Sequence, residues 1–315
     1  MELATLFERT HPGALDCSIL FPVWNGAKFL DESLASVLKQ EKVRAEIIVS
    51  DDCSSDASVE RINAIVSGYA GPHDVVVLKT SARAEFDHLP LLARRARSEI
   101  LIQAHQDDIA YPLRARALVD ALRGRVRLVT SVADYRVDGK LHAPSRADLE
   151  RVRGFKSFEP FLYSGYDVMI GSRFAMHADL FRLFPAIERS YLTGGLDILL
   201  PIRAVMIGRI ARIEKPLLAC GLHAERWSAR LWDTQSPQTK LFGYAVRRLA
   251  VLDRAARELK GAREAGLVGE AHAARLTDWF DRARARFVRE LVEARERLSR
   301  EGFELAWVAK PSATP

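Results

Sequence analysis

The sequence predicts an α/β protein with a Rossmann-like, mostly parallel central sheet, helices on both sheet faces and a helical extension at the C-terminus. Three observations predict this architecture. Short apolar segments alternate with helix-like periodic segments over the first 135 residues, and two long amphipathic segments follow residue 236. The chain has 315 residues, 48% of them hydrophobic, which is enough to bury one large core and leave an appendage.

The first 135 residues contain five expected strands and four expected helices. The strands are short, apolar and bounded by polar or turn residues: 17–23, 45–50, 75–78, 100–104 and 126–132. The helices repeat apolar residues at helical spacing: 29–39, 58–67, 89–97 and 113–122. Strands joined by helices pair in parallel through right-handed crossovers, so both faces of the sheet are expected to be covered.

The later part of the chain is less regular. Residues 136–167 fit no element, 169–183 predict a strand and a helix, 192–207 a loop and a helix, and 210–218 a strand. Apolar stripes at 241–259 and 276–298, joined by a link at 261–269, predict a helical hairpin. We therefore expect an α/β domain over 1–235, a hairpin over 236–309 and a disordered Pro/Ser/Thr tail over 310–315.

Composition and charge exclude several classes of protein. No apolar run approaches the 18 to 20 residues that span a bilayer and no signal peptide is recognisable, so we expect a cytoplasmic protein. Three widely spaced cysteines fit neither a disulfide framework nor a CxxC metal site. The net charge is +6, and residues 238–302 hold 15 Lys/Arg against 10 Asp/Glu. No basic-aromatic module accompanies this charge, so no nucleic-acid partner is expected.

Three polar loops follow the expected strands, at 22–26, 51–56 and 105–108. In open α/β sheets, ligands bind beyond the carboxyl ends of the strands, so these loops are expected to meet at one binding edge. The chain has neither GxGxxG nor a P-loop, so a nucleotide diphosphate bound there would need a divalent cation held by carboxylates. The pairs Asp51-Asp52 and Asp107-Asp108 are the candidates, and the alternative for each pair is a helix cap or solvated turn.

Three stretches carry a resemblance to a known family. Ser-Ile-Leu-Phe-Pro-Val-Trp-Asn-Gly at 18–26, Glu-Ile-Ile-Val-Ser-Asp-Asp-Cys-Ser-Ser-Asp at 46–56, and the approach from 96 into Gln-Asp-Asp-Ile at 106–109 resemble glycosyltransferase family 2. The similarity is continuous to about residue 132. It resumes more loosely at Asp197 and Arg203, and at Pro-Leu-Leu 216–218 followed by His223 and Ser228.

The resemblance implies a GT-A fold and an inverting transfer of a sugar from a UDP- or other nucleotide diphosphate donor to a glycan, lipid-linked or other hydroxyl acceptor. It divides the domain into a nucleotide-sugar half, about 15–135, and an acceptor half, about 136–235. It implies Asp107 and His223 as ligands of Mn²⁺ or Mg²⁺, and Asp197 as the catalytic base. The implied nucleotide-sugar contacts are Pro22, Val23, Asn25, Asp51, Asp52, Gln106 and Asp107, with Trp24, Asp108 and Trp227 at the sugar or acceptor.

Two departures from the family pattern keep alternatives open. His105 stands where the family often has the first Asp of DxD, and Leu196 where it often has Glu. One alternative is a non-catalytic GT-A domain that binds nucleotide or a partner protein. Another is a sugar nucleotidyltransferase, although its Gly-rich loop with a basic residue is missing.

Three structural interpretations also remain open. Asp197 would then cap a helix, His223 would be an ordinary histidine and Arg203 an ion-pair partner. The hairpin either completes the core, forms a homodimer or contacts the inner membrane surface.

Overall fold

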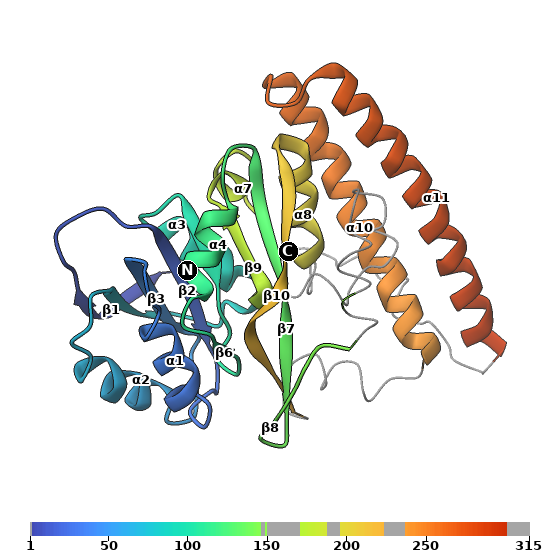
Figure 1. The fold of residues 1–315 in the computed structure, drawn as a ribbon. Coiled ribbons are helices and arrows are strands. Elements are labelled where there is room, and N and C mark those ends of the chain that lie inside the picture. The colour runs from blue at the N-terminus through green and yellow to red at the C-terminus, as the bar shows by residue number, and fades with distance from the viewer. Residues whose placement is uncertain (1, 146–148, 150–170, 188–195, 224–236, 301–315) are drawn as a thin grey trace.

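The computed structural model describes residues 2–145, 149, 171–187, 196–223 and 237–300. The described strands form one mixed sheet in the order β1-β4-β3-β2-β5-β9-β7-β10-β6, with β8 paired to β7 (Figure 1). Their bounds are β1 Leu3–Arg9, β2 Cys17–Val23, β3 Ala45–Asp51, β4 Asp74–Thr80, β5 Ile100–Gln103, β6 Ile109–Ala110, β7 Val126–Val137, β8 Lys140–His142, β9 Phe174–His177 and β10 Arg209–Leu222.

The centre of the sheet is parallel, which confirms the mostly parallel architecture expected from the sequence. Strands β4, β3, β2 and β5 pair in parallel, as do β7 and β10. Strand β9 lies antiparallel between β5 and β7, so β7 keeps the direction of β5. The carboxyl ends of β2, β3, β5, β7 and β10 therefore point to the same edge. In Figure 1 this edge faces downward, where β7 runs into β8.

Strand β1 was not predicted from the sequence. It is an edge strand, antiparallel to β4, and most of its side chains are exposed or only partly buried. A strand that buries neither face lacks the alternation of apolar and polar residues by which strands are recognised.

Helices cover both faces of the sheet. They are α1 Leu30–Leu38, α2 Ser58–Ser67, α3 His88–Arg95, α4 Arg114–Ala121, α7 Asp179–Arg182, α8 Leu196–Ile207, α10 Pro237–Glu264 and α11 Glu270–Arg300, with short 3₁₀ turns η1 Glu85–Asp87 and η2 Gly171–Arg173. Successive strand residues point to opposite faces. In β2, Leu20 packs into one core while Ile19 and Phe21 pack into the other.

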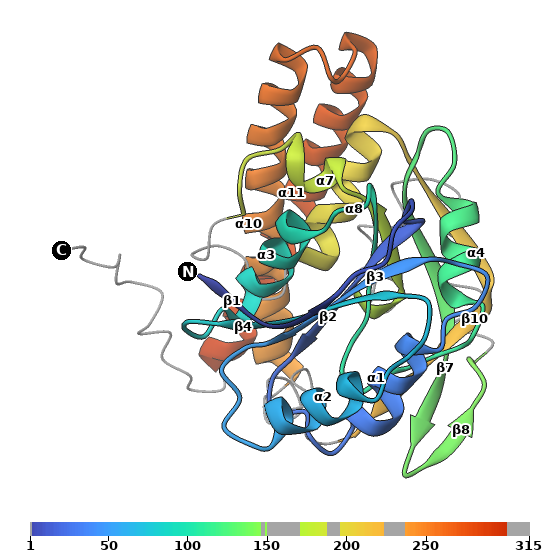
Figure 2. The ribbon, with the colours of Figure 1, turned by 90° about the vertical axis from the view of Figure 1, so that its left-hand side faces the viewer.

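The C-terminal hairpin belongs to the core of one sheet face. Helices α10 and α11 lie side by side and α10 packs along α8, as Figures 1 and 2 show from two directions. Leu252 of α10 and Phe287 of α11 are buried in the same hydrophobic cluster as Leu199 of α8 and Leu128 of β7. This packing is the one expected if the hairpin completes the core of the α/β domain.

Truncating one buried side chain of the hairpin should therefore destabilise the protein. Phe287 is fully buried, whereas the neighbouring Val288 is 43% exposed. We expect Phe287→Ala to lower the free energy of unfolding by about 3 to 5 kcal/mol, because it removes buried apolar area and leaves a cavity. Val288→Ala should change it by less than about 0.5 kcal/mol. Urea unfolding of both variants checks the difference, and equal small losses would show that the hairpin does not stabilise the core.

A buried histidine should make stability depend on pH. Burial lowers the pKa of His73, whose Nδ1 accepts a hydrogen bond from Ala45 N–H at 3.3 Å while Nε2 donates to the Gln40 carbonyl at 3.0 Å. Protonation of Nδ1 would break the first of these bonds. Because the unfolded chain binds the proton more readily, stability from neutral His73 is fully present above about pH 6.5 and is lost as the pH falls.

The expected slope is at most about 1.4 kcal/mol per pH unit for each buried histidine. Burial also lowers the pKa of His88, so His73→Gln should reduce the slope below pH 6.5 without removing it. Urea unfolding between pH 5 and 8 measures this. An unchanged slope in His73→Gln would contradict the prediction.

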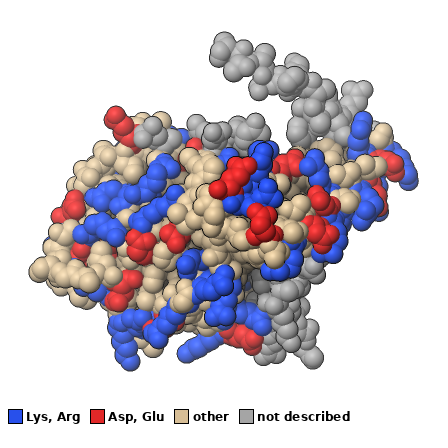
Figure 3. Space-filling model, turned by 90° about the horizontal axis from the view of Figure 1, so that it is seen from above, with Lys and Arg blue, Asp and Glu red and all other residues tan. Residues whose placement is uncertain are grey.

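Charge on the face opposite the binding edge is mixed. Figure 3, seen from above, shows Lys and Arg in several separate groups, with Asp and Glu between them, on the sheet domain and on the hairpin. Several of the hairpin's charges form helix ion pairs, such as Asp278–Arg282 and Glu290–Arg286. Among the described residues, no helix is long and apolar enough to cross a membrane.

Candidate functional site

The loop after β2 is fastened to the acidic loop after β5. The Gln106 side-chain amide accepts a hydrogen bond from Trp24 N–H at 2.7 Å and donates one to the Trp24 carbonyl at 3.0 Å. A β-carbon at Gly26 would meet the same amide oxygen at 2.6 Å, so a side chain at this position would displace the Gln106 amide. Both polar groups of Gln106, expected to contact the nucleotide sugar, bind the protein's own backbone and hold the two loops together.

The same loop is also joined to the turn after β3. The Val23 carbonyl accepts a hydrogen bond from Asp52 N–H at 2.8 Å, next to Pro22. Asn25 accepts one from Ser55 N–H at 2.8 Å on its side-chain oxygen, and its backbone adopts a left-handed φ of 48°. Pro22, Val23 and Asn25 therefore lie beside Asp51 and Asp52, as expected for one binding edge.

Asp51 and Asp52, which the sequence could not tell apart, have different surroundings. The Asp52 carboxylate accepts hydrogen bonds from Thr80 Oγ1 at 3.1 Å, Ala84 N–H at 2.6 Å, Glu85 N–H at 2.9 Å and Arg83 Nε at 3.0 Å. Burial raises the pKa of Asp52, but these hydrogen bonds and the charge of His88 outweigh it and hold that pKa below its usual value. Asp52 is therefore an ionised anchor for the loop after β4.

The neighbouring Asp51 keeps one oxygen uncommitted. Its Oδ2 accepts a hydrogen bond from Ser54 N–H at 3.0 Å. Its Oδ1 is buried and has no hydrogen-bond partner among the described residues. A buried carboxylate oxygen without a donor is costly, and no described residue compensates this one.

Arg83 is a site residue that the sequence did not reveal. It follows β4, and its guanidinium lies 3.4 Å from the centre of the Trp24 ring while bound to Asp52. Stacking of a guanidinium on an indole stabilises both side chains. No motif or periodicity singled out Arg83, because the contact joins residues almost sixty positions apart in the chain.

The acidic loop and the end of β10 bring Asp107 and His223 together. Nε2 of His223 lies 3.0 Å from Oδ2 of Asp107, and the imidazole packs against the Phe29 ring with centroids 4.6 Å apart. Burial raises the pKa of Asp107, but the bond from His223 and the charges of His105 and His223 outweigh it and lower that pKa overall. Asp107 is therefore an ionised oxygen donor beside an imidazole nitrogen.

His105 belongs to the same group. Ligand atoms of His105, Asp107 and Asp108 all lie within 4.8 Å of one another. The position that departs from the family pattern thus offers an imidazole instead of a carboxylate, and imidazole is a common ligand of transition metals. Sequence reasoning identified this residue only as a departure, although histidine is itself a metal-binding residue type.

Asp108 faces the interior. It is 8% exposed and its Oδ1 accepts a hydrogen bond from Gly221 N–H at 3.0 Å. Burial and the nearby charge of Asp107 raise its pKa, while His105, Ser172 and Gly221 act in the opposite direction. Asp108 was expected at the sugar or acceptor. Its burial and its bond to β10 suit a structural contact better than a surface that binds substrate.

Asp197 lies in the first turn of α8 and close to the acidic loop. Gly171 lies between Asp197 and Gln103: a β-carbon added there would be 2.9 Å from Oδ1 of Asp197 and 2.5 Å from Nε2 of Gln103. Nε2 of Gln103 in turn lies 2.9 Å from Nε2 of His105. Burial raises the pKa of Asp197 to about 6, against the charges of His105 and Arg247 and a hydrogen bond from Gly171 N–H. Asp197 is thus ionised at neutral pH yet more basic than an exposed carboxylate.

Two further predicted positions have different outcomes. Arg203 is fully buried and binds Glu258 through Nε at 2.8 Å and the Leu180 carbonyl at 2.8 Å, as expected for an ion-pair partner. Trp227 lies outside the described residues.

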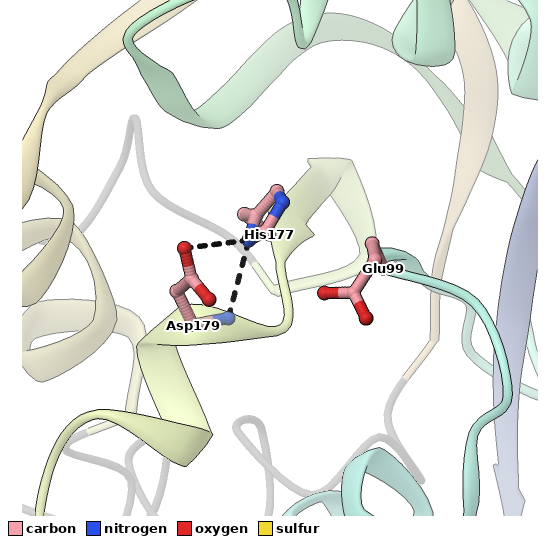
Figure 4. Close-up of side chains that lie close together, drawn as sticks. All are labelled: Glu99, His177 and Asp179. Carbon is pink, nitrogen blue, oxygen red and sulfur yellow. Dashed lines mark hydrogen bonds and ion pairs between the residues drawn. The ribbon is translucent and has the colours of Figure 1, made fainter.

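A second group of possible metal ligands lies at the other end of β5. It consists of Glu99, His177 and Asp179. Figure 4 shows His177 bound to Asp179, with Glu99 on a separate segment opposite them. Glu99 precedes β5 whereas His105 follows it, so this group is remote from Asp107. Arg182 pairs with Glu99, and Arg127 lies 3.6 Å from Asp179, so both carboxylates have cationic partners.

Solved structures share the fold of this chain. TarS of S. aureus, crystallised as residues 1–349 with UDP-GlcNAc, superposes with a TM-score of 0.57 at 18% identity, covering 87% of this chain and 72% of the crystallised TarS chain. The mannosyltransferase PcManGT of Pyrobaculum calidifontis, in complex with GDP-Man and Mn²⁺, gives a TM-score of 0.51 at 18% identity, covering 90% and 86%. At these identities the likeness shows the fold, which is the predicted GT-A fold.

Sequence comparison shows the family. No curated protein is significantly similar to this chain in sequence. The family model described as glycosyl transferase family 2 matches residues 18–184, which is more than half of the chain and includes the three loops at the binding edge. The chain therefore belongs to glycosyl transferase family 2.

Proposed function

We propose that this protein is a metal-dependent, inverting glycosyltransferase that moves a sugar from a nucleotide diphosphate donor to an acceptor hydroxyl. One observation carries the proposal: Asp107 and His223 are in direct contact at the carboxyl edge of the sheet, and the residues around them connect this pair to Asp51 and Asp197. Ligands bind at this edge in open α/β sheets. Family membership makes glycosyl transfer the expected chemistry.

The donor set fits a divalent transition metal. Asp107 supplies an ionised oxygen, and His223 and His105 supply imidazole nitrogens, a combination that Mn²⁺ accepts. PcManGT, which shares the fold, was crystallised with Mn²⁺. When bound, the metal would stabilise the negative charge that develops on the leaving diphosphate. Asp107, His223 and His105 would hold it, and the bonds of Gln106 to Trp24 keep the acidic loop in place.

Asp51 is the residue we propose for the nucleoside base. Its buried Oδ1 accepts no hydrogen bond from the described residues, so it requires an N–H donor. Uracil, thymine and guanine can supply one from the ring, and cytosine and adenine from the exocyclic amino group. Arg83 and Trp24, stacked beside it, would form a wall of the donor site.

Asp197 is the proposed catalytic base. Inversion requires the acceptor oxygen to attack the anomeric carbon from the face opposite the leaving group, with loss of its proton. A carboxylate with a pKa of about 6 is ionised at pH 7 and accepts a proton more readily than one with an ordinary pKa. The proton would move from the acceptor hydroxyl to an Asp197 oxygen, while the diphosphate leaves with the electron pair of the anomeric bond.

Donor hydrolysis tests the proposed function. The purified protein is incubated with Mn²⁺ and a panel of UDP-, GDP-, dTDP-, CDP- and ADP-sugars, and release of nucleoside diphosphate is measured. We expect slow release from at least one nucleotide sugar of the panel, and none without a divalent metal. Nucleotide binding in a thermal-shift screen without turnover of any donor or acceptor would instead favour a non-catalytic GT-A domain.

A further inference from the structure

Two buried charged residues lie directly behind the proposed metal ligands. Arg114, at the start of α4, is 2% exposed, and Asp108 is 8% exposed. Burial lowers the pKa of Arg114 to about 10, and the negative charge of Asp108 opposes that change, so the two groups interact electrostatically. Buried charges are costly unless they are paired and hydrogen-bonded. The proposed donor set includes neither of them, although Asp108 lies in the same group of possible ligands as His105 and Asp107.

Asp108 connects the acidic loop to the strand that carries His223. Its Oδ1 accepts the hydrogen bond from Gly221 N–H at 3.0 Å, two residues before His223. A β-carbon at Gly221 would lie 2.4 Å from the Asp107 carbonyl oxygen, so the backbones of β10 and the acidic loop are in close contact at this glycine. The carboxylate of Asp108 therefore fixes the spacing between Asp107 and His223.

Arg114 connects the acidic loop to the segment beside Asp197. One guanidinium nitrogen donates to the Gln103 carbonyl at 2.7 Å and to the Ser172 carbonyl at 2.6 Å. Gln103 lies two residues before His105, and Ser172 follows Gly171, whose N–H binds Asp197. A single side chain thus holds the start of the metal-binding loop against the segment that contacts the proposed base.

A small cavity lies between these two charges. Its volume is about 10 Å³, and its polar lining residues are His105, Asp108, Arg114 and Ser172. Nε of Arg114 is buried without a partner among the described residues. A cavity of this size holds one water molecule, and a buried water makes two to four hydrogen bonds. One water there can accept from Arg114 Nε–H and donate to the Asp108 carboxylate.

We propose that Arg114 and Asp108 form a water-bridged buried pair that positions Asp107, His105 and His223 for metal binding. This inference rests on the proposed function, because it concerns the metal site of that function. Both are positioning residues: they act on the metal through the segments they hold. Removal of either charge leaves the other buried without compensation, so the loop and the end of β10 shift apart. Partners behind metal ligands typically contribute 10-fold to 100-fold to metal affinity.

Mn²⁺ titration of the full chain tests the inference. The affinity for Mn²⁺ alone is measured by isothermal titration calorimetry for the wild type, Arg114→Met, Arg114→Lys and Asp108→Asn, each first checked for folding by circular dichroism and urea unfolding. We expect Kd to rise about 10-fold or more in Arg114→Met and Asp108→Asn. Because Asp108 is itself a possible ligand and Arg114 is not, the Arg114 variants decide whether the pair acts by positioning. Arg114→Lys keeps the charge and can still donate to the two carbonyls, but it lacks the Nε–H and the planar shape of the guanidinium. It should therefore show a smaller rise, and it provides a folded variant if Arg114→Met does not fold.

Arg116 gives the matched control. It lies on the same helix, is partly exposed and pairs with Asp120 at 2.7 Å on the surface. Arg116→Met should bind Mn²⁺ like the wild type. Folded Arg114 and Asp108 variants that lose stability but keep the wild-type Kd would overturn the inference and leave the proposed metal site intact. A wild type that binds no Mn²⁺ would overturn the metal site itself, and this inference with it.

Discussion

Replacing Asp107 by asparagine should abolish metal-dependent release of nucleoside diphosphate. Asparagine has nearly the same shape, and its side-chain oxygen can still accept the hydrogen bond from His223 Nε2, now 3.0 Å from the carboxylate. The substitution removes the negative charge that the metal requires. Because a bound metal contributes several kcal/mol to stabilising the charged transition state, the rate should fall by roughly a thousandfold or more. Turnover of the best donor with saturating Mn²⁺ measures the loss.

A second carboxylate of the chain provides the control for Asp107. Asp179 belongs to the other group of possible ligands, at the opposite end of β5, and it is partly exposed as Asp107 is. Asp179→Asn should leave both Mn²⁺ affinity and turnover unchanged. If Asp107→Asn retained wild-type turnover, or if Asp179→Asn lost it, the metal would not be held at the acidic loop.

The parallel part of the fold could be predicted because its signals are local. Strands β2, β3 and β4 are nearly continuous apolar runs between helical periods, since each is buried on both faces. Their order also placed the three polar loops at one edge. Among the antiparallel strands, β1 escaped prediction, whereas β9 was predicted as a strand within 169–183 but without its place in the sheet. Strand β1 is an exposed edge, and the position of β9 between β5 and β7 depends on pairings that no local pattern encodes.

The sequence predicted the residue types of the candidate site, but not which contacts each acidic residue makes. Sequence alone left Asp51 and Asp52 equivalent. They differ because the loop after β4 folds back over Asp52 and supplies its donors, Ala84 and Glu85 among them. Such contacts join residues some thirty positions apart, and the spacing of the acidic residues does not predict them. The same holds for Asp108, whose partner Gly221 lies more than a hundred residues away.

The hairpin shows a further limit of sequence reasoning. An amphipathic stripe indicates that one face of a helix is buried, but it does not identify the element that packs against that face. In this structure, α8 and the sheet pack against the apolar faces of the hairpin. Helix α10 also carries Arg247, whose positive charge lowers the pKa of Asp197. The helical extension is thus connected to the proposed base as well as to the core.

Replacing Asp197 by asparagine should lower kcat by about 10² to 10⁴, the usual contribution of a general base. Mn²⁺ affinity and nucleoside diphosphate binding should be unchanged, since Asp197 belongs to α8 and not to the acidic loop. Asp278→Asn, which alters an exposed carboxylate of α11 paired with Arg282, is the control and should keep wild-type kcat. Single-turnover assays with saturating donor separate kcat from binding.

The pH dependence identifies the base independently of the size of that loss. Burial raises the pKa of Asp197 to about 6, so the ionised form that accepts the proton disappears as the pH falls through that value. Wild-type kcat should therefore be constant from about pH 7 upward and fall tenfold per unit well below pH 6. With Mn²⁺ kept saturating at every pH, so that protonation of the histidine ligands does not limit the rate, the residual rate in Asp197→Asn should lack this acidic limb. The same limb in the variant would mean that another group removes the proton, and the catalytic role would then have to be assigned to a residue outside α8.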